Sequence, residues 1–391
     1  MFGSRFRLSA SSATARILRY ACNYATALGV ITFRVECNRG DGRLVAQQRR
    51  WFKWLSMLFR ILISYLYCHF YGSFIIVLQN IHFQLIVGVR MLCSLICALV
   101  ILMMQFWYEE QLIALVNTFL QLFRRVKSLP GCQDMCFGGH RELILLLFGV
   151  LCQIYQCFYL LPTLIDEFNI EFTFTVFLET YSSLSTAIIC YICFVGYLSV
   201  GALYHHINRY IRHELRDQLE KLKPSNESRA QRKAASYRLD ECLAIYEDIQ
   251  RVSREFQRLF DVPLCLAIIF GFLTMALVSF FVVLNQFNGF AMWVLEMKIF
   301  LEMLLLTLSI QGTIHNSRVV RRLSLENYYL TERSDWHKKL EMFLSRLNYN
   351  EFRVRPLGLF DVSNELILVF LSALVTYLTY IIQYGMQSNQ L

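Results

Sequence analysis

The sequence predicts an all-α polytopic membrane protein with seven transmembrane helices. Of its 391 residues, 56% are hydrophobic and 17% are charged, whereas a typical soluble domain carries about 25% charged residues. Several apolar runs reach the roughly 20 residues that a helix needs to cross the hydrocarbon core of a bilayer. The five prolines lie at or beyond the ends of these runs, where helices begin and end.

Eight apolar segments are expected to form helices. They cover residues 17–35, 54–79, 82–107, 142–163, 171–203, 262–286, 291–312 and 365–384. The first carries Arg19, Asn23 and Arg34 with little strong hydrophobicity between them, so we expect an interfacial helix that does not cross the membrane. The other seven segments are the predicted spans.

The lysines and arginines predict which way these spans run. With seven spans and a cytosolic N-terminus, the inner segments are residues 1–53, 108–141, 204–261 and 313–364. These segments hold 35 of the 38 Lys and Arg residues, and the other three lie within hydrophobic segments. Cytoplasmic loops of membrane proteins carry such an excess. We therefore expect a cytosolic N-terminus and an extracellular C-terminus.

Apolar stripes in the inner segments predict further helices outside the bilayer. Apolar residues recur at helical spacing over residues 112–123, 239–259 and 336–347. The first stripe indicates that the second span continues into the cytosol. Helices of this kind bury their stripes either within one subunit or in a cytosolic hub shared by subunits, and both arrangements fit the sequence.

No pattern in the chain predicts an enzyme, a cofactor or a nucleic-acid surface. We find no nucleophile–base pair or phosphate-binding loop, and the basic residues belong to inner loops. Cys132, Cys136 and His140 have loosely metal-like spacing but no clear fourth ligand, so no metal site is expected.

Charged residues within the apolar segments are candidate functional groups. Arg60 lies near the inner end of its span and is expected to extend toward the interface. Arg90 lies deeper and could pair with Glu179 or Glu296 or contact a ligand. Lys298 and Glu302 are one helical turn apart, so a local ion pair is expected; a ligand role for such charges is the alternative.

A ligand pocket is expected in the outer half of the bundle, where aromatic and small polar side chains are frequent. Such a mixture suits a largely apolar cavity with a few orienting groups. The candidate lining residues are Tyr155, Tyr159, Tyr181, Phe281, Gln286, Trp293 and Arg90.

The last apolar segment, 365–384, ends in a polar face. Hydroxyl and amide groups gather on one side of this helix at Thr376, Tyr380, Gln383 and Tyr384. Such a face in a membrane requires a partner helix or water. The residues alone leave two interpretations open, a polar helix–helix contact or the lining of a pore.

The end of the chain resembles the C-terminal signature of insect gustatory receptors, which is Thr-Tyr, five hydrophobic residues and Gln-Phe. Here Thr376 and Tyr377 are followed by five residues and then by Gln383 and Tyr384. Tyr384 stands at the Phe position, and a hydroxylated ring there is easier to wet than a phenyl ring. The run Gly358-Leu359-Phe360 also resembles this family, as do the length, the spans and the inverted orientation.

This resemblance, to a family of seven-span chemoreceptor channels related to insect odorant receptors, implies a ligand-gated, non-selective cation channel. It implies a homo- or hetero-tetramer with related subunits in the plasma membrane of a sensory neuron, gated by a small-molecule tastant. Carried over by position, Tyr380, Gln383 and Tyr384 would face the central pore, with Thr376 a turn deeper.

The implied organisation has four parts. Residues 1–53 form the cytosolic N-terminus with its interfacial helix. A six-helix ligand-sensing domain follows over 54–312, with cytosolic helices at 108–141 and 204–261. Residues 313–364 form the cytosolic anchor segment. Residues 365–391 form the pore-lining seventh helix and a short extracellular tail.

Two other classes of protein compete with this interpretation. A secondary transporter could use Arg90, Lys298 and Glu302 as coupling groups, but such proteins often contain internal repeats and broken helices, and neither is evident here. A G-protein-coupled receptor is disfavoured because the N-terminus of such a receptor lies outside the cell, whereas the charge pattern here predicts a cytosolic N-terminus.

Overall fold

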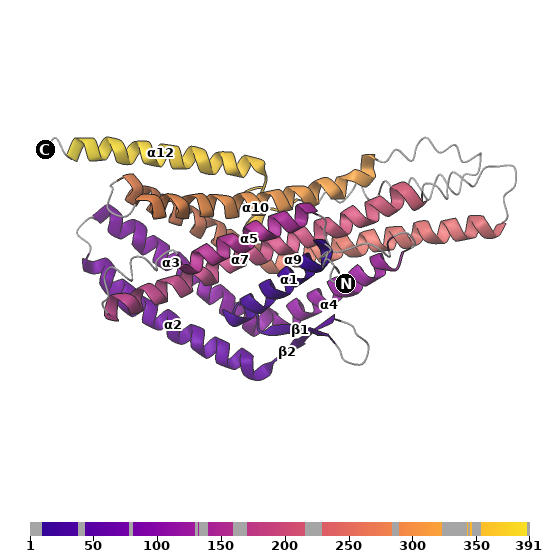
Figure 1. Cartoon of the computed structure of the whole chain (residues 1–391), viewed down its shortest axis with the longest axis horizontal. Helices are drawn as coiled ribbons and strands as arrows, with labels where there is room; N and C mark the ends of the chain where they lie inside the picture. The colour runs from indigo at the N-terminus through magenta and orange to yellow at the C-terminus, as the bar shows by residue number, and fades with distance from the viewer. Residues whose placement is uncertain are drawn as a thin grey trace, which may run out of the picture.

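The computed structural model places most of the chain in long helices that run side by side (Figure 1). It describes residues 10–37, 44–77, 81–129, 132, 140–158, 170–215, 229–283, 289–322, 342, 345 and 353–388. The apolar stripe at 336–347 lies almost wholly outside these residues, as do Tyr159 and Gln286.

The described elements comprise the helices of the bundle and one short hairpin. In chain order they are α1 (Ala10–Ala27), β1 (Phe33–Cys37), β2 (Leu44–Gln48), α2 (Arg50–Val77), α3 (Ile81–Met103), η1 (Met104–Tyr108), α4 (Glu109–Lys127), α5 (His140–Phe158), α7 (Ile170–Tyr210), η2 (Ile211–Leu215), α9 (Arg229–Val283), α10 (Gly289–Arg322), η4 (Pro356–Gly358) and α12 (Asn364–Ser388). The predicted all-α class is confirmed, with the β1–β2 hairpin as an addition.

Five helical stretches among the described residues are long and apolar enough to cross a membrane. They are Arg50–Ile76, Gln84–Lys127, His140–Phe158, Ile170–Leu215 and Asp240–Phe280. Two predicted spans are not in this set. The apolar part of α10 carries Glu296, Lys298 and Glu302, and α12 contributes a shorter apolar stretch, Glu365–Tyr377.

The second predicted span continues well beyond the thickness of a membrane. The continuous helix through α3, η1 and α4 is 44 residues long over Gln84–Lys127, about twice the length that a bilayer requires. η1 is a π-helical turn within this helix, a feature frequent at functional sites. The expected extension of this span is therefore confirmed as helix.

α7 is the central helix of the bundle. Its second half is buried on nearly all sides, as expected for a helix that is apolar all round. Tyr197 of α7 packs edge-on against Phe256 of α9, with ring centroids 5.2 Å apart. Tyr204 meets Tyr246 of α9 at 5.1 Å. The stripe predicted over 239–259 thus packs within the subunit.

The N-terminal helix begins and ends earlier in the chain than the predicted segment 17–35, since α1 covers Ala10–Ala27. α1 stops at Ala27, and Gly29 follows with φ of +65°. The Gly29 and Val30 amides donate to the Thr26 and Ala25 carbonyls, both at 2.9 Å, which is the hydrogen-bond pattern of a Schellman cap. Glycine ends the helix here because it alone adopts this left-handed conformation without steric cost.

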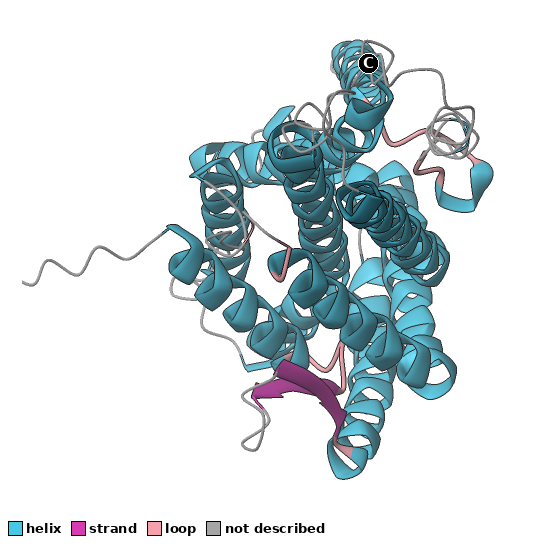
Figure 2. Cartoon of the chain, turned by 90° about the vertical axis from the view of Figure 1, so that its right-hand side faces the viewer, coloured by secondary structure: helices cyan, strands magenta, loops and turns pink. Residues whose placement is uncertain are grey.

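The N-terminal residues after α1 form the antiparallel β1–β2 hairpin. In Figure 2, which looks along the bundle, this hairpin lies at the side opposite α12. The Ala46 amide donates to Asn117 Oδ1 of α4 at 2.8 Å, so the hairpin is tied to the extension of the second span.

The prediction that every proline marks a helix boundary is wrong for Pro263, which lies inside α9. Proline removes one helical hydrogen bond. Membrane helices tolerate this loss because neighbouring helices and side chains satisfy the freed backbone groups. α9 packs against α3, α7, α10 and α12, so its interior proline lies within a supported helix.

Candidate functional site

A cavity of about 510 Å³ lies within the helix bundle. Side chains from α2, α3, α5, α7, α9 and α10 line it, so each helix of the bundle core contributes to one space. Its volume falls in the range of roughly 300–1,000 Å³ that is usual for small-molecule sites. The walls combine aromatic and aliphatic side chains with two groups of charged residues.

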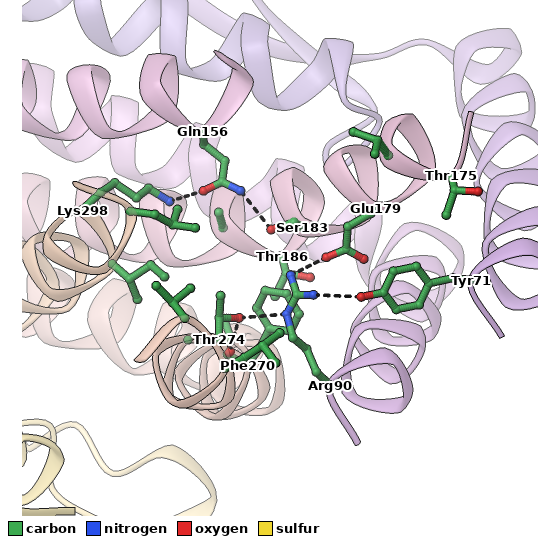
Figure 3. Close-up of a pocket in the computed structure, with 18 of the residues that line it drawn as sticks. Tyr71, Arg90, Gln156, Thr175, Glu179, Ser183, Thr186, Phe270, Thr274 and Lys298 are labelled. Atoms are coloured by element: carbon green, nitrogen blue, oxygen red, sulfur yellow. Dashed lines mark hydrogen bonds and ion pairs between the residues drawn. The ribbon is translucent and has the colours of Figure 1, made fainter. Parts of the chain in front are cut away.

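Arg90 of α3 is the centre of the first charged group (Figure 3). Its guanidinium forms an ion pair with Glu179 of α7. It also donates from Nε to Thr274 Oγ1 at 3.2 Å and stacks over the Phe270 ring at 5.2 Å. Tyr67 Oη donates to the second oxygen of Glu179 at 2.6 Å. Four helices therefore share this buried network.

Lys298 of α10 is the centre of the second charged group. Its Nζ lies 2.8 Å from Glu302 Oε2 and donates to Gln156 Oε1 of α5 at 2.6 Å. Gln156 in turn donates from Nε2 to Ser183 Oγ of α7 at 3.0 Å (Figure 3). The amide of Gln156 thus connects the ammonium on one side with a hydroxyl on the other.

The pairings expected for the intramembrane charges are confirmed in part. Arg90 pairs with Glu179, and Lys298 pairs with Glu302. Glu296, the other candidate partner of Arg90, instead accepts a hydrogen bond from Ser279 at 2.7 Å. Both pairs are buried, where an unpaired charge would be costly.

Of the predicted pocket residues whose side chains the structure describes, Arg90 lines this cavity, and Tyr155, Tyr181 and Trp293 lie elsewhere. Tyr155 packs in a neighbouring cluster of α9, α10 and α12 side chains. Tyr181 donates to the Leu28 carbonyl at 3.1 Å, and Trp293 is 56% exposed. The side chain of Phe281 lies outside the described residues, together with Tyr159 and Gln286.

The lining residues that the sequence did not single out are mostly apolar or small polar side chains on helical segments. Their identity depends on which helix faces meet, and an isolated sequence does not fix this. Gln156, Ser183 and Thr274 are examples, as they look like ordinary polar residues of apolar helices. The available signal was charge, which singled out Arg90 with Glu179 and Lys298 with Glu302 as groups within the bundle.

The expectation that Arg60 extends to the membrane interface is wrong. Its side chain is only 1% exposed and donates from Nη2 to the Leu28 and Gly29 carbonyls at 3.0 and 3.2 Å. Gln105 of η1 also donates to the Gly29 carbonyl. The turn after α1 thus offers backbone acceptors inside the bundle, and they replace water as partners of the guanidinium.

The face predicted to line a pore is exposed on α12. Thr376, Tyr380 and Gln383 are exposed, whereas Leu374 is buried against the bundle. Phe370 of α12 packs on Phe272 of α9 with centroids 5.4 Å apart. Tyr377 turns inward and is half-buried, while the side chain of Tyr384 lies outside the described residues.

Long apolar helices around a partly polar cavity, of the size usual for small-molecule sites, define the class as a helical membrane protein. Comparison with known proteins identifies the family. Residues 18–388 match the model of the 7tm chemosensory receptor family. A Drosophila melanogaster protein named gustatory receptor 93b is 42% identical over 98% of this chain and 97% of its own length.

Further relatives agree with this match. Gustatory receptor 93c of Drosophila melanogaster is 39% identical over 98% of each chain. The solved structure of the insect olfactory receptor OR5 from Machilis hrabei, in complex with eugenol, aligns with a TM-score of 0.64 at 12% identity. It covers 95% of this chain and 99% of that one. The chain therefore belongs to the chemosensory receptor family, among the insect gustatory receptors, and has their seven-span all-α fold.

Proposed function

We propose that this gustatory receptor is a ligand-gated, non-selective cation channel in which a small-molecule tastant binds the internal cavity. The cavity is the observation that carries the proposal. It lies among the bundle helices, has a suitable volume, and is bordered by helices that also contact the last helix. A ligand that reshapes it can therefore act on α12 through α9 and α10.

In this proposal α12 lines the pore. Its polar face is exposed in the single chain, and one helix cannot enclose a water-filled path. Four copies related by rotation could bring the faces around one axis. Amide and hydroxyl groups such as Gln383 and Tyr380 can replace part of an ion's hydration shell. The tetramer combines identical or related subunits.

The proposed orientation places the N-terminus in the cytosol and the C-terminus outside the plasma membrane of a sensory neuron. The charge distribution supports it, because 35 of the 38 basic residues fall in the proposed inner segments. The cytosolic parts, including residues 313–364, would anchor subunits to one another. Family membership favours a receptor over a transporter, and the orientation disfavours coupling to a G protein.

The test is to express the chain in a heterologous cell and to record current while small molecules are applied. We expect ligand-evoked current carried by cations, with a reversal potential that changes in the Gln383→Ala variant. Unchanged permeation after simultaneous replacement of Tyr380, Gln383 and Tyr384 by alanine would place the pore elsewhere. Expression alone and with a related subunit separates the homomeric from the heteromeric channel.

A further inference from the structure

The charged residues of the cavity restrict the kind of molecule that it can hold. Three carboxylates line it, from Glu171, Glu179 and Glu302, against two cations, Arg90 and Lys298. Of these, Glu171 is exposed at the start of α7, whereas the two cations are buried and already paired with Glu179 and Glu302. Among the described lining residues, a ligand carboxylate would therefore lose its hydration without meeting an unpaired cation, which is costly.

The Lys298 group has hydrogen-bond donors left for a ligand. An ammonium carries three N–H donors, and Lys298 uses two of them on Gln156 and Glu302. Within the described part of the chain the third has no protein acceptor, and Lys298 lines the cavity. Ser183 accepts from Gln156, and its own hydroxyl hydrogen likewise has no acceptor among the described residues.

The remaining walls suit an apolar body. Phe270, Leu277, Val278 and Ile299 also line the cavity, as does Phe172 near the start of α7. Aromatic and branched side chains of this kind favour rings and branched hydrocarbon over flexible polar chains.

We propose that the cavity binds an uncharged molecule with a ring-containing apolar body; this inference rests on the ligand site of the proposed function. At one end the molecule carries a hydrogen-bond acceptor, such as a carbonyl or ester oxygen. Lys298 and Ser183 donate to this acceptor and select for it, and Gln156 holds the two donors in position. Anionic relatives of such a molecule are rejected because Arg90 and Lys298 are already paired with carboxylates, and pure hydrocarbons because they leave the donors unpaired.

The test uses binding rather than current, so it stands apart from channel activity. Purified full-length protein in lipid nanodiscs is titrated with three matched sets of probes, and its melting temperature is followed by intrinsic fluorescence. The first set holds the methyl esters of benzoic, 2-naphthoic and 4-biphenylcarboxylic acid. The second holds the corresponding carboxylates, and the third holds ethylbenzene, 2-ethylnaphthalene and 4-ethylbiphenyl.

At least one ester should raise the melting temperature saturably, and its matched carboxylate and hydrocarbon should bind about tenfold more weakly or worse, as expected for one hydrogen bond. Ser183→Ala should weaken the ester by a similar factor. The double variant Lys298→Met/Glu302→Gln should also weaken ester binding by a similar factor. It removes both charges together and leaves no unpaired ion.

Ser185→Ala is the matched control. Ser185 lies on the same helix, is buried, and is not part of the cavity wall, so ester binding should not change. The inference is overturned if a carboxylate or a hydrocarbon binds as tightly as its ester, if no ester binds, or if Ser183→Ala and the double variant bind like the parent. Ester binding without evoked current would instead contradict the proposed gating and leave the ligand class standing.

Discussion

Buried charges in this receptor are held by specific partners rather than by water. The Arg90 guanidinium contacts Glu179, Thr274 and Phe270, and Arg60 contacts two backbone carbonyls. Sequence reasoning found Arg90 and one of its partners because both carry charge. It missed the partners of Arg60, since any residue type can supply a backbone carbonyl.

Removal of Arg90 alone should be more harmful than removal of the whole ion pair. Arg90→Met leaves Glu179 buried without its cation and should cost about 3–5 kcal/mol of stability. Arg90→Met/Glu179→Gln keeps an acceptor for the Tyr67 hydroxyl and should recover most of that loss. Melting temperatures of the detergent-purified variants measure this difference, and equal losses would show that the pair does not act as a unit.

Gly29 is a second position where the structure depends on one residue, here on the absence of a side chain. A β-carbon there would lie 2.3 Å from Ser56 Oγ, and its φ is +65°. Gly29→Ala should therefore cost at least about 1–2 kcal/mol, seen as a lower melting temperature. Gly72→Ala is the control, because nothing lies within 4 Å of a β-carbon at that helical position. Gly72→Ala should be neutral or stabilising, so similar losses at both sites would contradict this account.

At the scale of elements, helices were predictable and their connections were not. Long apolar runs predict α2, α3, α7 and α9, because burial in the bundle and membrane crossing both require long apolar helices. The turn after α1 and the β1–β2 hairpin were absent from the prediction, since a short segment with scattered apolar residues has no strong period. The conformation of this segment follows from Gly29 and from hydrogen bonds with residues far along the chain.

The turn that leads into α12 is held by two acidic residues. Leu357 has φ of 52°, a strained conformation for a non-glycine residue, and its amide donates to Asp261 Oδ1 of α9 at 2.9 Å. Arg355 Nη2 donates to Asp361 Oδ2 at 2.8 Å, and this hydrogen bond lowers the pKa of Asp361. α12 is thereby attached to α9 just before it begins.

Asp361→Asn should loosen this turn. Because the folded-state pKa of Asp361 is lowered, the stabilisation is present above the ordinary aspartate pKa of about 3.9. It is lost only as the pH falls through the lowered value. At neutral pH the variant should therefore exchange the Val362 amide hydrogen, which bonds the Val354 carbonyl at 3.0 Å, faster than the parent. Hydrogen exchange by mass spectrometry measures this, and unchanged exchange would contradict a role for the pair.

The whole molecule shows where sequence reasoning reaches its limit. The seven-span class and the family could be predicted, because composition, charge distribution and a C-terminal motif are properties of the chain itself. The residues that line the cavity could not, because its wall is assembled from helix faces separated by long stretches of sequence. Of the predicted pocket residues whose side chains are described, only Arg90 lines it, and its charge makes it recognisable in isolation.

The central claim is that the polar face of α12 lines a cation pore, and cysteine accessibility tests it most directly. Thr376→Cys, Tyr380→Cys and Gln383→Cys are each compared with the parent and with Leu371→Cys, which is exposed on another face of the helix. The account predicts that a positively charged, water-soluble thiol reagent blocks ligand-evoked current in the three polar-face variants alone. Block equal to that in Leu371→Cys, or no block at any of the three, would contradict it.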